Sequence, residues 1–177
     1  MGIRHKTISV LLCALVILGA GCVFKQSQYT GVMSYRNGRV YLQNKNYYRV
    51  GVLPEGWRHM DSKARAISFY NEAYKSSINT DAFCAKSFAD RPLDTLAGEL
   101  SSVLSDRTTL TTEEFMLDGR GALRLLVTGT MDGVAVSMDI VVVKKNGCNF
   151  DFVAVTPPDA PDALTNDFET FFNGFHY

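Results

Sequence analysis

Three short pairs of Asp or Asn followed by Gly divide residues 108–156 into strand-like runs. Both residues of such a pair tolerate positive φ, which a two-residue hairpin turn requires. Between the pairs, apolar residues alternate with polar ones, as they do in strands that have one buried face. The pairs are Asp118-Gly119, Asp132-Gly133 and Asn146-Gly147. The pattern therefore predicts a four-stranded antiparallel meander with one apolar and one largely polar face.

Two cysteines fall on the apolar faces of predicted strands. Residues 67–83 could form a helix, but their β-branched and aromatic content favours two strands. In the second of these strands, Cys84 follows Ile78 at even spacing and shares its apolar face. Cys148 lies in the same way on the apolar face of the last meander strand, together with Phe150. We therefore expect both thiols to point inward.

Two helices are predicted, one before the meander and one after it. Arg91-Pro92 opens the first, because proline fits the first helical position, where no N–H is needed. Pro161 opens the second, and Gly174 is its expected stop. Their apolar stripes comprise Leu93, Leu96, Leu100, Val103 and Leu104 in the first helix and Leu164, Phe168, Phe171, Phe172 and Phe175 in the second. This order predicts a single α+β domain in which an antiparallel β-sheet meander is packed with helices.

The N-terminus has the composition of an export signal. Arg4 and Lys6 precede an apolar run over residues 8–18, and small residues follow. The stretch Leu18-Gly19-Ala20-Gly21-Cys22 resembles the lipobox of bacterial lipoproteins, although Gly19 stands where that pattern usually has Leu. An ordinary secretory peptide or an uncleaved membrane anchor is the alternative, but the apolar run is short for a spanning helix.

The lipobox resemblance implies three parts of the chain. Residues 1–21 would be the signal peptide, residues 22–30 a lipidated tether and residues 31–177 the globular domain. Acyl chains on Cys22 would attach the protein to a membrane, because several chains make attachment lasting. In a double-membraned cell, Val23 in place of Asp would permit transfer to the periplasmic face of the outer membrane.

The predicted mature chain has no excess of positive charge that would attract nucleic acid. Of 18 Lys and Arg residues, Arg4 and Lys6 lie in the predicted signal, which leaves 16 against 18 Asp and Glu, a net charge of −2. Binding to nucleic acid depends strongly on an excess of positive charge. We therefore expect no nucleic-acid partner.

Two cysteines remain if Cys13 leaves with the signal and Cys22 is acylated. Cys84 and Cys148 form an even pair in an exported, oxidising setting, which predicts a disulfide. Two buried free thiols are the alternative, because cysteine is often buried. A reactive thiol is less favoured, since neither cysteine has a CxxC motif or a basic cluster beside it.

The stretch from Tyr48 to Trp57, YRVGVLPEGW, resembles the opening element of the PsbP-like superfamily. A helix at Pro92, a long meander and a terminal helix are similar in order to that superfamily over about residues 47–177. The resemblance implies an α/β/α-type sandwich and a non-enzymatic accessory protein that docks on a larger assembly. It carries over no catalytic residue.

The sequence contains no clustered residue pattern for metal binding or catalysis. His59 and His176 are far apart, and neither has a second ligand at close spacing, so we predict no metal site. Glu113 and Glu114 are adjacent in a predicted strand and should face opposite sides of the sheet. They therefore cannot act together as a general acid and a general base. No GxSxG nucleophile motif occurs. We therefore expect a protein that is not an enzyme and needs no cofactor.

Tyrosine and arginine gather in the N-terminal hairpins, and both residue types are enriched at the centres of protein interfaces. The sequence predicts a docking face that contains Tyr47, Tyr48, Arg49, Tyr70 and Tyr74. Ordinary half-exposed strand tyrosines are the alternative.

The predicted function is that of a membrane-anchored envelope lipoprotein, an accessory module that binds a protein partner of a larger envelope assembly. The alternative is a lipoprotein for a small ligand or lipid, with a pocket between the sheet and the helix that carries Phe168 and Phe172. An envelope enzyme is the third possibility, and the residues support it least.

Overall fold

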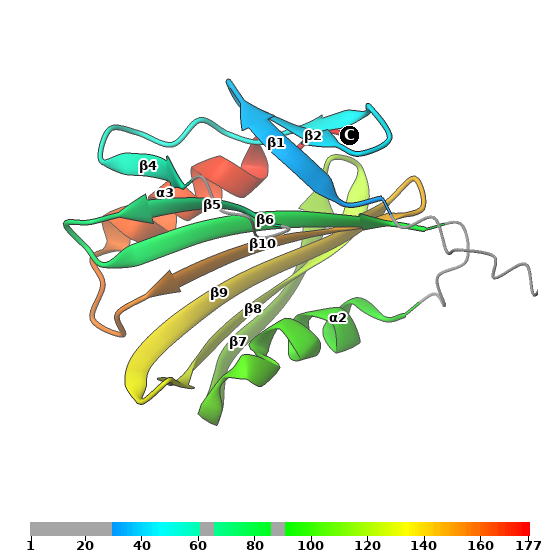
Figure 1. Ribbon diagram of the computed structural model, residues 1–177. Helices are drawn as coiled ribbons and strands as arrows, with labels where there is room; N and C mark the ends of the chain where they lie inside the picture. Colours follow the sequence, from blue (N-terminus) through cyan, green and yellow to red (C-terminus); the bar gives the residue numbers. More distant parts are fainter. Residues whose placement is uncertain (1–29, 61–65, 86–90) are drawn as a thin grey trace, which may run out of the picture.

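The computed structural model describes residues 30–60, 66–85 and 91–177. The predicted signal peptide and Cys22 lie outside these residues. The described residues form a seven-stranded sheet, a three-stranded sheet and two α-helices (Figure 1). In chain order the elements are β1 (Val32–Arg36), β2 (Arg39–Leu42), β3 (Tyr47–Arg49), β4 (Trp57–Met60), β5 (Ile67–Asn71), β6 (Ser76–Cys84), α2 (Leu93–Leu100), the 3-10 turn η2 (Ser101–Val103), β7 (Ser105–Leu117), β8 (Arg120–Met131), β9 (Val134–Lys145), β10 (Cys148–Thr156) and α3 (Asp162–Asn173). The chain is thus a single domain of mostly antiparallel sheet with two helices, as the sequence predicts.

The predicted meander forms more than half of the larger sheet. Its strands β7 to β10 are joined by turns in which Asp118, Asp132 and Asn146 have φ of 48°, 50° and 51°. The strand order is β4-β5-β6-β10-β9-β8-β7, and every neighbouring pair is antiparallel. Strands β5 and β6 confirm the prediction of two strands, rather than a helix, at residues 67–83.

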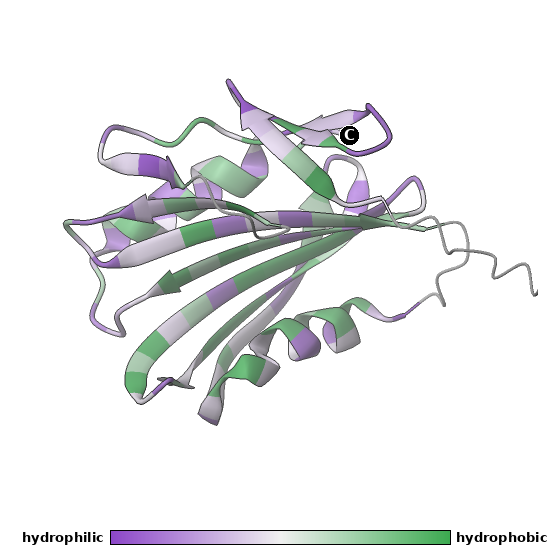
Figure 2. Ribbon diagram, in the orientation of Figure 1, coloured by the Kyte–Doolittle hydropathy of each residue, from purple (hydrophilic) through white to green (hydrophobic). Residues whose placement is uncertain are grey.

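Both faces of the seven-stranded sheet are covered along much of its length. α2 packs against β8 and β9 on one face, and α3 and the three-stranded sheet cover the other face (Figure 1). Residues 140–143 are all buried and enter the two cores alternately, with Val141 and Val143 on the α3 side. The prediction that one meander face is largely polar is therefore wrong beneath α3. Figure 2 shows hydrophobic residues along much of the meander strands.

The first helix is shorter than its predicted apolar stripe. α2 ends at Leu100, and η2 then advances each residue by 120° instead of 100°. Val103 is consequently turned outward and 60% exposed, so its assignment to the stripe is wrong. Leu104, one residue later, is buried against the meander.

Gly51 allows α3 to approach the N-terminal part of the chain. β3 ends at Arg49, and the Gly51 N–H donates to the Phe171 carbonyl of α3 at 2.8 Å. A Cβ on Gly51 would overlap the carbonyl of Thr170, and a Cβ on Gly174 would overlap the backbone of Gly51. Both glycines are therefore required by close backbone contact.

The disulfide predicted between Cys84 and Cys148 is present. The two residues are directly opposite each other in the β6–β10 pair, and both side chains point inward as predicted. Thr30 and Cys84 also exchange two backbone hydrogen bonds of 3.1 and 3.0 Å. The disulfide therefore lies where the predicted tether joins the domain.

We predict that Gly51→Ala lowers the free energy of unfolding by about 3 kcal/mol, because α3 must move to accommodate the new methyl group. Gly98→Ala is the matched control. Gly98 lies in α2 with open space around its Cα, so alanine should stabilise by about 0.5–1 kcal/mol through helix propensity. Urea unfolding of both variants measures the difference. Equal stability of Gly51→Ala and the wild type would contradict the close contact.

Replacing both Cys84 and Cys148 with alanine should lower the free energy of unfolding by about 4 kcal/mol, since the bridge spans 64 residues and restricts the unfolded chain. Thermal unfolding with and without a thiol reductant checks the assignment. The reductant should lower the melting temperature of the wild type and leave that of the double variant unchanged.

Candidate functional site

The predicted docking residues do not share one surface. Tyr48 is fully buried and its hydroxyl lies 2.9 Å from Thr80 Oγ1, so its assignment to a docking face is wrong. Burial raises the pKa of the Tyr48 phenol well above its ordinary value. The physical reason is strand alternation, because neighbouring residues of β3 point to opposite faces and Tyr48 takes the inner one.

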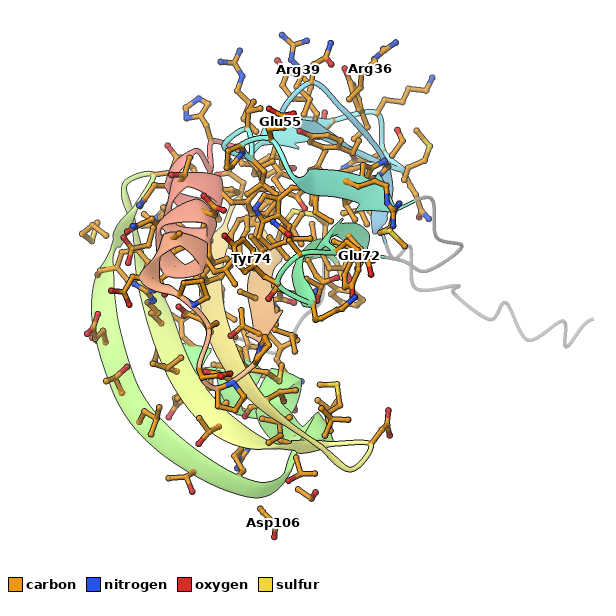
Figure 3. The ribbon with its side chains drawn as sticks, turned by 90° about the vertical axis from the view of Figure 1, so that its left-hand side faces the viewer. Arg36, Arg39, Glu55, Glu72, Tyr74 and Asp106 are labelled. Atoms are coloured by element: carbon orange, nitrogen blue, oxygen red, sulfur yellow. A yellow bond between two sulfur atoms is a disulfide. The ribbon has the colours of Figure 1, made fainter. Side chains whose placement is uncertain are left out.

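Tyr70 and Tyr74 lie on a different part of the molecule. Tyr70 belongs to β5 and Tyr74 to the turn that follows it. Figure 3 shows Tyr74 far from Arg36 and Arg39, which project from the three-stranded sheet. Tyr74 therefore cannot join Tyr47 in a single contact area, and Tyr70 belongs to the seven-stranded sheet rather than to the three-stranded one.

Two tyrosines and three arginines form the exposed surface of the three-stranded sheet. We call this surface the β1–β3 outer face, and its members are Arg36, Arg39, Tyr41, Tyr47 and Arg49. The strand register places Arg36 and Arg49 opposite Arg39, and Tyr47 opposite Tyr41. The inner residues of the same strands, Val40, Leu42 and Tyr48, are buried and hold the sheet in place.

Stacking orders the side chains of the β1–β3 outer face. The Arg39 guanidinium lies 4.9 Å from the centre of the Tyr47 ring, and the Arg36 guanidinium lies 5.8 Å from that of Tyr41. The two tyrosine rings are 5.8 Å apart. The neighbouring Arg36 guanidinium, followed by that of Arg39, lowers the pKa of the Tyr41 phenol.

The arginines of this face have no acidic partner. Among residues 30–60, 66–85 and 91–177, no carboxylate forms an ion pair with Arg36, Arg39 or Arg49. Each guanidinium keeps N–H donors that can pair with a carboxylate in bidentate fashion. The face is therefore suited to an acidic surface.

A concave feature lies between α3 and the meander. We call it the α3 hollow; its volume is about 380 Å³, and its lining includes Glu113, Arg124, Asp139, Phe168 and Glu169. Phe172, which the pocket hypothesis also named, is buried in the core instead. Glu114 faces the opposite side of the sheet, as predicted for adjacent strand residues.

Arg124 organises the floor of the α3 hollow. Its Nε and Nη2 donate to the two oxygens of Asp139 at 2.9 and 2.6 Å, and its Nη1 donates to Glu169 Oε1 at 2.7 Å. The guanidinium also lies 5.5 Å from the centre of the Phe172 ring. Hydrogen bonds to Asp139 are the main reason why the pKa of Arg124 is raised. Strand alternation predicts only that the meander face carrying Arg124 and Asp139 is largely polar, so this network was not expected from the sequence.

Asp151 is a further ionisable group with an unusual environment, which no pattern in the sequence indicates. It is paired with Asp81 across β10 and β6, next to a hollow lined by Leu96 and Leu100 of the α2 segment. Burial, followed by repulsion from Asp81, raises the pKa of Asp151 to about 7.

The described part of the chain contains neither a metal-binding cluster nor a membrane-spanning helix. No group of three or more His, Cys, Asp or Glu residues in it could hold a metal ion. No helix there is long and apolar enough to cross a membrane.

No known protein family and no curated protein matches this sequence. Solved structures do resemble it. A protein from Bacteroides thetaiotaomicron VPI-5482 has a TM-score of 0.53 and 11% identity, and the match covers 73% of this chain. This chain spans only 44% of that protein.

LpqN of Mycobacterium tuberculosis, described as involved in cell envelope biogenesis, matches over 97% of this chain and 96% of its own, with a TM-score of 0.51 and 15% identity. PsbP (CyanoP) of Synechocystis sp. PCC 6803 matches over 88% and 95%, with a TM-score of 0.49 and 15% identity. At these identities the similarity to the Bacteroides protein and to LpqN concerns the fold.

Asp151→Asn should remove a pH-dependent loss of stability. From about pH 4 to about pH 7 the folded state keeps a proton that the unfolded state releases, so wild-type stability falls as the pH rises through this range. Above about pH 7 the ionised carboxylate costs a few kcal/mol, which Asn avoids. Urea unfolding at about pH 5 and about pH 8 measures the effect. Asp159→Asn in an exposed loop is the control, and an equal response of both variants would contradict the assignment.

Proposed function

We propose that this chain is a membrane-anchored envelope lipoprotein whose domain acts, without catalysis, as an accessory module of a larger envelope assembly. In this proposal the β1–β3 outer face binds an acidic surface of a protein partner. The observation that carries the proposal is a set of three arginines that form no ion pair with a carboxylate of the described residues, two of which, Arg36 and Arg39, stack on tyrosines.

Physical reasons favour a protein partner for this face. Arginine and tyrosine supply much of the binding energy at interface centres, because they combine apolar area with directional hydrogen bonds. Stacking on Tyr41 and Tyr47 restricts Arg36 and Arg39 before a partner arrives, which reduces the entropy lost on binding. An acidic partner would also be attracted over a distance and would associate faster at low salt.

The predicted lipid anchor supports the membrane part of the proposal. From Cys22 to Thr30 the chain could extend at most about 28 Å. Because β1 begins two residues after Thr30, the β1–β3 outer face would stay close to the membrane and to proteins embedded in it.

Two further observations agree with an envelope location. The disulfide suits an oxidising compartment outside the cytoplasm. LpqN, which shares the fold, is described as involved in cell envelope biogenesis. We place the protein on the periplasmic face of the outer membrane if the cell has two membranes.

Cross-linking in the native cell, followed by affinity capture and mass spectrometry, tests the proposal. The double variant Arg39→Glu and Arg49→Glu should lower recovery of the principal envelope partner by about tenfold or more, because each reversal places like charges together. Arg120→Glu, which reverses one charge at the exposed start of β8, should leave recovery unchanged. Cys22→Ser should also lower recovery if anchoring is needed for assembly.

The proposal fails if no partner exceeds background. It also fails if Arg120→Glu lowers recovery as much as the double variant does. Tyr74→Ala is a further control, because Tyr74 is 43% exposed but lies away from the β1–β3 outer face (Figure 3).

A further inference from the structure

We infer that the α3 hollow is a binding site for a small organic cation, an ammonium group carried on a short apolar body. This site goes beyond the proposed docking function, and it uses none of the residues of the β1–β3 outer face.

The shape of the hollow sets the size of its ligand. It lies between residues 164–169 of α3 and the strands β7, β8, β9 and β10, and the loop at residues 157–160 contributes to its lining. Figure 3 shows the long strands of the meander curving around the side on which α3 lies. A volume of about 380 Å³ is at the small end for ligand pockets and suits a compact molecule.

The lining combines apolar and polar groups. The apolar residues are Leu126, Ala154, Pro157, Pro158, Ala160, Leu164 and Phe168. Hydroxyl and charged groups lie among them, and Leu126, for example, is directly opposite both Thr111 and Asp139. A ligand with one charged end and a short apolar body could contact both kinds of group, whereas a long acyl chain would leave the polar groups without hydrogen-bond partners.

The charge of the lining selects the sign of the ligand. The lining contains three carboxylates and one guanidinium, which gives a net charge of −2. The carboxylates belong to Glu113, Asp139 and Glu169, and the guanidinium belongs to Arg124. The chain from residue 146 to its end supplies α3 and the closing loop, and it contains no Lys or Arg. The field in the hollow therefore favours a cation.

The hydrogen bonds already formed leave acceptors open in the hollow. Asp139 uses both oxygens for Arg124, and Glu169 uses only Oε1. The side chain of Glu113 forms no hydrogen bond or ion pair with any described residue. An ammonium group has three donors and no acceptor, so it matches the open oxygens of Glu113 and Glu169. An anion would have to compete with Asp139 and Glu169 for the donors of Arg124.

Nuclear magnetic resonance titration of the purified full-length chain with hexylammonium tests the inference. Hexanol and hexanoate, which share its chain length, are the neutral and anionic controls. Hexylammonium should shift the amide signals of Ser137 and Thr165 saturably, and both controls should bind at least about tenfold more weakly.

Variants then assign the cation to the two carboxylates. Glu113→Gln combined with Glu169→Gln should weaken hexylammonium binding by about tenfold. Glu114→Gln is the matched control, because it changes the next residue of the same strand on the opposite face. The fluorescence of Trp57, whose indole donates to Asp167 of α3 at 2.8 Å, verifies that each variant is folded.

Three outcomes would overturn the inference: no saturable shift with hexylammonium, equal or tighter binding of hexanoate or hexanol, or unchanged binding in the glutamine double variant. The docking proposal stands apart from this test. Arg39→Glu with Arg49→Glu should bind hexylammonium as the wild type does, so failure at one site leaves the other proposal intact.

Discussion

The position of β10 between β6 and β9 determines most of this structure. Phe150 and Phe152 of β10 enter the core under α3, and Val153 and Val155 contact the core under α2. A slip of one residue would exchange these two sets and bury the polar side chains instead. The register with β9 follows from a short hairpin, but the register with β6 joins residues far apart in sequence. The disulfide directly across β6 and β10 fixes that second register.

Unequal element lengths account for the α3 hollow. A helix of 12 residues such as α3 is about 18 Å long, whereas a 12-residue strand such as β8 or β9 extends about 40 Å. α3 can therefore cover only part of the sheet. Contact between Gly51 and Gly174 fixes the C-terminal end of α3 against the N-terminal segment. The uncovered part of the sheet consequently lies beside the N-terminal half of α3, where Arg124 and its partners replace apolar packing.

Local patterns in the sequence predicted the strands, the turns, both helices and the cysteine pair, because alternation and turn chemistry act over a few residues. Two errors arose although a local pattern was available, and one contact was missed because its partners are distant in sequence. Tyr48 was assigned to a surface although its neighbour Tyr47 already occupied the outer side of the same strand, and alternation alone could have excluded it. The consecutive apolar residues 140–143 also signalled a strand buried on both faces. The contact of Glu169 with Arg124 has no such local signal, since it depends on where α3 packs.

Opposite charges are separated within this domain, and the separation has a physical consequence. Arginines occupy the outer face of the three-stranded sheet, whereas the segment that forms α3 contains acids and no Lys or Arg. A net charge near zero would otherwise suggest weak electrostatic preferences. Like charges are clustered in each region, however, so each region can attract an oppositely charged partner that lies within about a Debye length, roughly 8–10 Å. The same fold can therefore attract an acidic protein surface at one place and a small cation at another, and neither interaction requires the other.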